Sequence, residues 1–177
     1  MYWYLIFVKE DRKEYVRHLL MSEFSSNVLV PFIPMKDMLL KYSGGIKKER
    51  HMLFPGYVFV EWKLSSQEMI DRTNIIISAS KDILAFFNYP DTNEIAIREH
   101  EKAELLDLFN DDHCIELSNG IKVDRNIYIQ KGPLKGKESI LKKVDRHKRR
   151  AYIELHFMGM ARQITVGLNV KTYIPDT

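Results

Sequence analysis

Apolar residues fill both alternating positions of the first eight residues, a pattern that predicts a β-strand. Trp3, Leu5 and Phe7 lie on one side of this strand. We expect a helix to follow, with Asp11 as its N-cap and Glu14 completing a capping box. The buried face of that helix is formed by Val16, Leu19 and Leu20.

Residues 27–34 form a second extended segment, because Pro31 and Pro34 exclude a helix there. Residues 36–50 are polar around Gly44-Gly45, which predicts a projecting hairpin tip or a mobile loop. The segment LFPGYVFVEW breaks at Pro55-Gly56 and then continues in strand-favouring residues.

Ser65 and Glu68 form a second capping box, which predicts a short helix that ends near Ile70. Residues 75–77 and 83–87 follow as further strand-like segments. Residues 97–110 are expected to form a last helix, whose buried side is Leu105, Leu106 and Phe109. The order predicts a split βαβ, ferredoxin-like α/β sandwich over residues 1–110, with one sheet face left for solvent or a partner.

The polar segment 111–120 is expected to be a linker. Beyond it the pattern contains only short strands, over 126–130, 138–144, 150–157, 162–166 and 170–174. Five short strands at this spacing predict a small β-barrel over residues 121–177. The predicted fold class is therefore α+β, with two domains joined by a linker.

Charge separates the two predicted domains. Residues 121–177 hold 13 basic and 5 acidic side chains, whereas residues 1–120 hold 14 basic and 19 acidic ones. A segment of strongly positive sign suggests a polyanionic partner. A solubilising basic surface is the simpler alternative.

Several function classes lack support in the sequence. The six histidines are scattered, the single cysteine, Cys114, excludes an internal disulfide, and no metal-binding or catalytic motif is present. No apolar run approaches the ~20 residues of a membrane span. We therefore expect a cytoplasmic monomer without enzymatic activity, metal or cofactor.

The segment LFPGYVFVEW, between a basic Gly-containing loop and a capped helix, resembles the N-terminal (NGN) domain of the NusG family. The segment from Ile129 to Val170, which begins IQKGPLKGKES, resembles a KOW motif in an SH3-like barrel. The resemblance implies a transcription elongation or antitermination factor. Its first domain is expected to bind the clamp of bacterial RNA polymerase and to suppress pausing.

The resemblance also implies where polymerase binds. Aromatic and apolar residues of three strands are the expected pocket for the clamp tip, although a role in the core is the alternative; these are Trp3, Phe7, Tyr57, Phe59, Leu84 and Phe87. Arg72, Thr73 and Asn74 match the contact with the opposite pincer. Lys47, Lys48 and Arg50 lie in the loop that approaches upstream DNA in relatives, so DNA is a possible further partner.

The basic second domain is similar to the LoaP branch of the family, whose members read an RNA hairpin near the transcript leader. Basic groups of this kind attract phosphates, and few aromatics interleave with them, which favours structured RNA over a stacked single strand. The predicted RNA-binding residues are Lys131, Lys135, Lys137, Lys142, Lys143, Arg146, His147, Lys148, Arg149, Arg150 and Arg162.

Two alternatives stay open at this point. In the first, the chain is a general NusG-type factor whose KOW domain binds a protein such as Rho or a ribosomal protein. In the second, it is a KOW-bearing component of the ribosome or of translation. A relative of the RfaH kind, whose second domain refolds as helices, is disfavoured by Gly132, Pro133 and Gly136.

Overall fold

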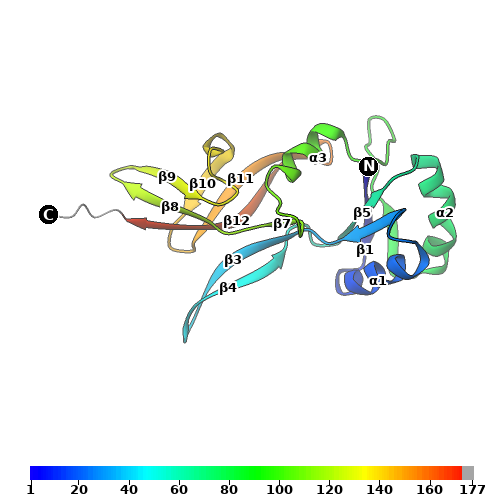
Figure 1. Ribbon diagram of the computed structural model, residues 1–177, viewed down its shortest axis with the longest axis horizontal. Helices are drawn as coiled ribbons and strands as arrows, with labels where there is room; N and C mark the ends of the chain where they lie inside the picture. The colour runs from blue at the N-terminus through cyan, green and yellow to red at the C-terminus, as the bar shows by residue number, and fades with distance from the viewer. Residues whose placement is uncertain (173–177) are drawn as a thin grey trace. The chain divides into compact units, whose positions relative to one another are not determined.

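The computed structural model describes residues 1–172 (Figure 1). The chain forms two compact units: the first joins Met1–Pro34 to Phe54–Lys102, and the second joins Met35–Leu53 to the chain from Ala103 onward. The elements are β1 (Tyr2–Val8), η1 (Glu10–Arg12), α1 (Lys13–Glu23), β2 (Leu29–Phe32), β3 (Met35–Tyr42), β4 (Gly45–Met52), β5 (Tyr57–Trp62), α2 (Ser66–Ala79), β6 (Ile83–Phe86), α3 (Glu99–Leu106), β7 (Cys114–Ile115), β8 (Ser118–Val123), β9 (Asn126–Lys131), η2 (Glu138–Ile140), β10 (Leu141–Asp145), β11 (Arg150–Phe157) and β12 (Met160–Thr172).

The first unit contains a four-stranded sheet of order β2-β5-β1-β6, in which all neighbours are antiparallel. Helix α1 connects β1 to β2, and these two strands lie on either side of β5. Helix α2 connects β5 to β6, which lie on either side of β1. Each crossover is therefore a βαβ unit split by a strand between its two parallel members.

One face of this sheet packs on α1 and α2. Alternate residues of β1 and β5, among them Tyr4, Ile6 and Val60, are fully buried there together with Leu20 of α1 and Met69 of α2. Because side chains alternate across a strand, one stripe of each strand supplies this core. The hydrophobic effect of this burial holds the helices against the sheet.

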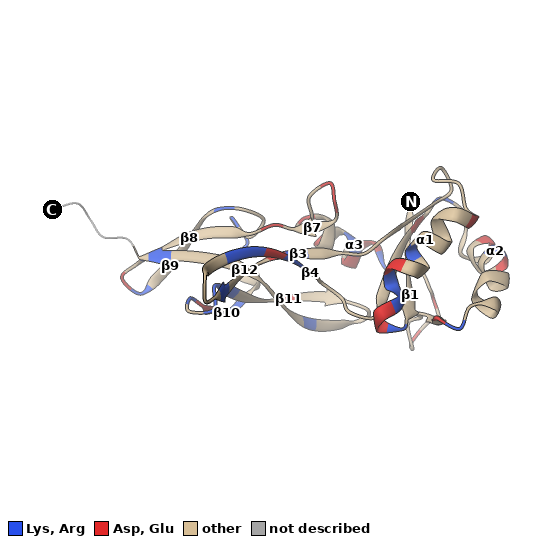
Figure 2. Cartoon of the chain, turned by 90° about the horizontal axis from the view of Figure 1, so that it is seen from below, with Lys and Arg blue, Asp and Glu red and all other residues tan. Residues whose placement is uncertain are grey.

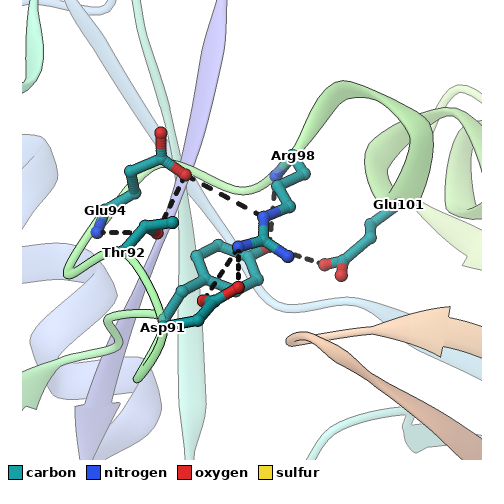
Figure 3. A network of polar contacts seen from close by, with 6 residues as sticks. Asp91, Thr92, Glu94, Arg98 and Glu101 are labelled. Atoms are coloured by element: carbon teal, nitrogen blue, oxygen red, sulfur yellow. Dashed lines mark hydrogen bonds and ion pairs between the residues drawn. The ribbon is translucent and has the colours of Figure 1, made fainter.

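The last loop of the first unit is held by a polar network around Tyr89 (Figure 3). The Tyr89 hydroxyl donates to Oε2 of Glu101 at 2.6 Å and accepts from the backbone N–H of Arg98 at 3.1 Å. The Arg98 guanidinium lies 4.1 Å from the Tyr89 ring centroid and binds both carboxylate oxygens of Asp91, at 2.9 and 2.8 Å. Burial raises the pKa of Tyr89, with the Glu101 bond as a second cause.

The second unit combines a five-stranded sheet of order β10-β11-β12-β8-β9 with a three-stranded sheet of order β4-β3-β7. The β3–β4 hairpin turns at Ser43 and Gly44, and Gly45 begins β4, so this segment is the hairpin rather than the mobile loop of the two sequence-based alternatives. Strand β12 pairs antiparallel with β11 and parallel with β8. Strands β10 and β9 are the edges of the larger sheet, and its closure into a barrel stays a prediction.

The β3–β4 hairpin packs tightly on β12 within this unit. Gly167 of β12 lies so close to β3 that a Cβ atom there would collide with the carbonyl oxygen of Asp37 and crowd the Leu117 side chain at 2.8 Å. Only a glycine permits this approach. The hairpin is therefore part of the second unit, although it lies far from β12 in the sequence.

Several sequence predictions about the first unit are corrected here. Residues 75–77 are helical, because α2 continues to Ala79. Asp11 lies in the 3-10 turn η1, and no side-chain cap begins α1 at Arg12. Leu106 is 46% exposed, whereas Leu105 is buried as predicted. The capping box of Ser65 and Glu68 is confirmed.

The second unit also differs from the predicted pattern. Segments 162–166 and 170–174 belong, as far as Thr172, to the single strand β12, and residues 173–174 lie outside the described part. Segment 138–140 is the 3-10 turn η2 rather than strand. The segment 111–120 contains β7 and the start of β8, with Cys114, Ile115 and Ser118 fully buried.

Candidate polymerase and nucleic-acid interfaces

Phe7 and Tyr57 form an aromatic pair on neighbouring strands of the first unit. They are directly opposite in the β1–β5 register, and their ring centroids lie 5.3 Å apart. Phe7 is 41% exposed and Tyr57 is half-buried. Gly56, at a φ of +89°, lies under the Phe7 ring, so that a Cβ there would approach it to 3.1 Å. The absence of a Cβ at Gly56 therefore leaves room for the Phe7 ring, which is tilted by 43° from that of Tyr57.

The other predicted pocket residues divide into buried and exposed ones. Trp3 and Phe59 are fully buried, with ring centroids 6.0 Å apart, and both rings contact Phe32. Leu84 is 49% exposed and Phe87 is half-buried. The aromatic side chains of this sheet face thus form a core beneath a smaller exposed patch.

The predicted pincer contact lies within α2 rather than at its end. Arg72 and Asn74 are exposed on the helix. Thr73 is fully buried, and its hydroxyl donates to the Met69 carbonyl at 2.6 Å. Thr73 therefore has a structural role in the helix, and only its two neighbours present side chains to solvent.

Residues 146–149 form the turn between β10 and β11, here called the basic turn (Arg146, His147, Lys148 and Arg149). The Arg149 amide donates to the Arg146 carbonyl at 3.3 Å, and the Leu168 amide of β12 donates to the Arg149 carbonyl at 3.1 Å. Asp145 accepts from the Lys148 amide at 2.9 Å, and this bond lowers the pKa of the Asp145 carboxyl. The backbone of the turn is therefore fixed.

Arg149 has a left-handed backbone, with a φ of +52°. A residue with a Cβ pays about 1–2 kcal/mol for this conformation, which glycine adopts freely. Such an outlier in a fixed turn motivates a functional hypothesis for the side chain.

The basic residues of the hairpin are partly neutralised by Asp37, which is 2% exposed. The Lys48 ammonium lies 3.3 Å and the Arg50 Nε 3.3 Å from the two Asp37 oxygens. The Cys114 thiol of β7 donates to the same carboxylate at 3.8 Å. Burial, and then the Asp37 charge, raise the pKa of Cys114 to about 11. Lys47 instead lies 5.9 Å from the ring centroid of Tyr42.

The basic turn and the hairpin meet at a cleft within the second unit. Its walls are Leu39–Tyr42 of β3 on one side and His147–Arg150 on the other, and its volume is ≈ 460 Å³. Figure 2 shows Lys and Arg positions on the hairpin and at the β10 end of the larger sheet. Basic groups that are far apart in the sequence thus share one concave surface.

Arg150 lines the cleft, whereas Lys36 precedes the residues of β3 that line it. Burial, and then the Arg150 charge, lower the pKa of Lys36. The Arg150 Nε is buried and has no hydrogen-bond partner among residues 1–172. These features favour an anionic ligand. An anion would reduce the repulsion between the two cations and would accept a hydrogen bond from the Arg150 N–H.

The remaining predicted RNA-binding residues are more dispersed. Lys137 lies 3.2 Å from Asp107, and Lys142 lies 3.0 Å from Glu154, so both have acidic partners. The Arg162 Nε donates to the Phe157 carbonyl at 3.1 Å. The Lys143 ammonium lies 5.7 Å from the ring centroid of Tyr152, while Lys131 and Lys135 are exposed.

Sequence reasoning missed Tyr42 as a residue of the cleft and Lys36 as a further cation on the same strand. Tyr42 is 45% exposed and its hydroxyl donates to Glu49 at 2.7 Å. Both residues lie on alternate positions of β3, so they share a face of the strand. The sequence signal for these residues was the basic, Gly-containing segment, which predicted the β3–β4 hairpin. The packing of that hairpin on β12 is a tertiary contact, which the periodicity of the sequence does not encode.

The comparisons with known proteins decide the family. The family model described as transcription termination factor NusG matches residues 1–106, which contain the whole first unit and the β3–β4 hairpin. The chain belongs to the NusG family. No curated protein matches it in a sequence comparison.

Membership in the NusG family makes the chain a transcription elongation or antitermination factor, and proteins of this family bind RNA polymerase. Within residues 1–172, no group of three or more His, Cys, Asp and Glu residues is arranged to hold a metal ion. In the same part of the chain, no helix is both long and apolar enough to cross a bilayer.

Proposed function

We propose that this NusG-family chain is a specialised antitermination factor of the LoaP kind. The first unit binds the clamp of bacterial RNA polymerase, and the second unit, with a KOW domain, binds a structured leader RNA. The observation that carries the proposal is the cleft between β3 and the fixed basic turn, where Lys41 faces Lys148, Arg149 and Arg150 and where the buried Arg150 Nε has no hydrogen-bond partner among residues 1–172.

The proposed polymerase contact consists of Phe7, Tyr57 and Leu84, with Trp3 and Phe59 as the rigid support beneath them. Exposed aromatic and apolar groups on a rigid base are typical of interface anchors. On α2, Arg72 and Asn74 are the residues that would contact the opposite pincer. No bond is made or broken by this protein; docking stabilises the closed clamp and slows entry into paused states.

RNA binding in this account brings the factor to its target transcript. Because both units belong to one chain, RNA binding then raises the local concentration of the first unit near polymerase. The contacts with RNA are mostly to phosphates, so affinity falls steeply as salt is raised. A higher affinity for the RNA hairpin than for an unrelated duplex distinguishes specific recognition from nonspecific binding to phosphates.

Two variants of the full-length chain separate the surfaces. Phe7→Ala is expected to weaken polymerase binding by about thirtyfold, as for an anchor residue, and to leave RNA affinity unchanged. The double variant Arg149→Glu, Arg150→Glu is expected to abolish hairpin binding and to leave polymerase affinity unchanged. Leu106→Ala, at an exposed site outside both surfaces, is the control.

Affinities for polymerase and for an RNA hairpin are measured by fluorescence anisotropy, with circular dichroism to show that each variant is folded. If the charge reversal left hairpin binding intact, the basic turn would not be the RNA site. If the wild-type chain bound hairpin and duplex equally, and only at low salt, the chain would be a general NusG-type factor with a protein partner.

A further inference from the structure

The cleft between β3 and the basic turn has features of a site for an unpaired nucleotide. It is concave, it is lined by cations on both walls, and it contains the exposed ring of Tyr42. A duplex surface is bound through phosphates and shape and does not require an exposed ring in a cleft. A single-stranded segment, in contrast, is bound by combining a positive groove with aromatic rings on which bases stack.

We propose that this cleft binds unpaired nucleotides of the RNA, with a base stacked on Tyr42 and a phosphate held by Arg150 of the facing wall. The inference rests on the proposed function, since it names the part of the RNA that the second unit reads. It adds the β3–β4 hairpin to an interface that the sequence assigned to the C-terminal domain alone.

The positions along β3 fit this assignment. Lys36 lies outside the lining of the cleft, six residues before Tyr42 on the same face of the strand, which corresponds to about 20 Å. A strand of that length runs beside several successive nucleotides. Lys41 and Lys148 line opposite walls of the cleft and add charge to the path of the RNA backbone.

The acidic side chains around the cleft have partners of their own. Asp37 is occupied by Lys48 and Arg50, Asp145 accepts from the backbone of the turn, and Glu49 accepts from the Tyr42 hydroxyl. The Glu49 bond also restrains the orientation of the Tyr42 ring. A ring held in place loses less entropy when a base stacks on it.

Gly167 makes the composite site possible. It lets β12 approach the backbone of β3 at Asp37, while the Leu168 amide fixes the basic turn through the Arg149 carbonyl. Both walls of the cleft are therefore anchored on β12, at the adjacent residues Gly167 and Leu168. A site anchored on rigid elements keeps its geometry in the absence of ligand.

The test uses the full-length chain, because a fragment beginning after residue 110 would lack the hairpin wall. The probes are an RNA hairpin with a randomised loop, a blunt duplex of the same stem and a single-stranded DNA of the same loop pool. Affinities are measured by anisotropy at about 50 and about 200 mM salt.

Tyr42→Leu is expected to weaken loop-hairpin binding about tenfold and to leave duplex binding unchanged. Tyr42→Phe, which keeps the ring and removes the bond to Glu49, is expected to bind like wild type. Lys36→Met is expected to weaken hairpin binding and to lower the salt slope by about one. Tyr128→Leu and Lys122→Met, on β9 and β8 of the same unit, are the matched controls.

Each outcome has a defined meaning. If Tyr42→Leu and Lys36→Met both bound the hairpin like wild type while Arg149→Glu, Arg150→Glu did not, the composite site would be wrong and the proposed function would stand. If wild type showed no preference for the hairpin, both would be overturned, and an acidic protein surface would be the partner to seek. Equal affinity for the DNA pool would overturn the assignment to RNA.

Discussion

At the scale of single residues, Arg149 joins backbone strain to charge. Its φ of +52° is costly for any residue with a Cβ, and the position is the last of the basic turn. Asp124 and Met158 have the same left-handed backbone in two other turns of this unit, so turn geometry accounts for the conformation and the charge of Arg149 for the proposed function. The structure and the proposed function thus meet at one residue.

Replacing this residue is expected to improve stability and to impair binding. Arg149→Gly removes the left-handed penalty but adds entropy to the unfolded chain, so the free energy of unfolding should rise by about 0–1 kcal/mol. The affinity for the RNA hairpin should fall, because the positive charge that would bind a phosphate is lost. Urea unfolding and anisotropy on the same preparations give both values. Lower stability in the glycine variant would show that Arg149 contributes to packing instead.

The pKa of the Cys114 thiol depends on how β7 packs against the β3–β4 hairpin. Because its pKa is raised to about 11 in the folded state, against about 8.5 in an unfolded chain, the neutral thiol stabilises the fold below the unfolded value. That contribution is lost as the pH rises from about 8.5 toward 11.

Urea unfolding from pH 7 to 11 is the measurement for this effect. Wild type should lose stability more steeply than Cys114→Ala, which has no group that titrates at this position. Other groups, such as Tyr89, titrate in both proteins and cancel in the comparison. Parallel curves for the two proteins would mean that the thiol is not held neutral by its surroundings.

At the scale of elements, helix α2 begins with a reciprocal capping box. The Ser65 amide and hydroxyl both donate to Glu68, at 3.1 and 3.0 Å, and the Glu68 amide donates back to the hydroxyl oxygen at 3.3 Å. The backbone bond from Ser65 lowers the pKa of the Glu68 carboxyl. This box fixes the start of the helix that carries Arg72 and Asn74.

Ser65→Ala is expected to cost about 1 kcal/mol of unfolding free energy near neutral pH. The loss should shrink in acid, because the stabilisation from a carboxylate with a lowered pKa disappears as the pH falls and Glu68 becomes protonated. Ser78→Ala, at an exposed position of the same helix, is the control and should be close to neutral. Chemical denaturation at pH 7 and in acid gives the free energy of unfolding of both variants. Equal losses of stability in Ser65→Ala and Ser78→Ala would contradict this prediction.

The elements show what sequence could and could not predict. Capping chemistry and alternation located the start of α2 and the strands β1, β5 and β11, because these signals are local. The run from Ile75 to Ile77 was predicted as a strand, since three β-branched residues favour one; in the structure the helix continues, with Ile76 and Ile77 packed on the core. Tertiary packing there overrides propensity.

The sites follow the same division. Phe7 and Tyr57 were named from the family resemblance, and the basic residues of the turn were named from their crowding in the sequence. The buried state of Trp3 and Phe59 depends on the packing of rings from several strands. The second wall of the cleft depends on Gly167 and on a contact between segments about 130 residues apart. Neither is contained in a local pattern, so neither could be predicted.

At the scale of the whole molecule, the two units carry different chemistry. The first presents an aromatic patch on a sheet whose other face is covered by two helices. The second presents a fixed basic turn beside a hairpin with a net excess of cations. The family match covers the first unit and the hairpin, so the KOW domain and its RNA are the part that the proposal adds.

The most direct test of this account is transcription by bacterial RNA polymerase on two templates with the same terminator. One template carries a leader that folds into the hairpin bound best by the chain; in the other, the hairpin stem is disrupted. We expect the wild-type chain to raise terminator read-through on the first template only, and Arg149→Glu, Arg150→Glu to abolish the rise. Equal read-through on both templates would contradict the account, because the chain would then act on polymerase without reading RNA.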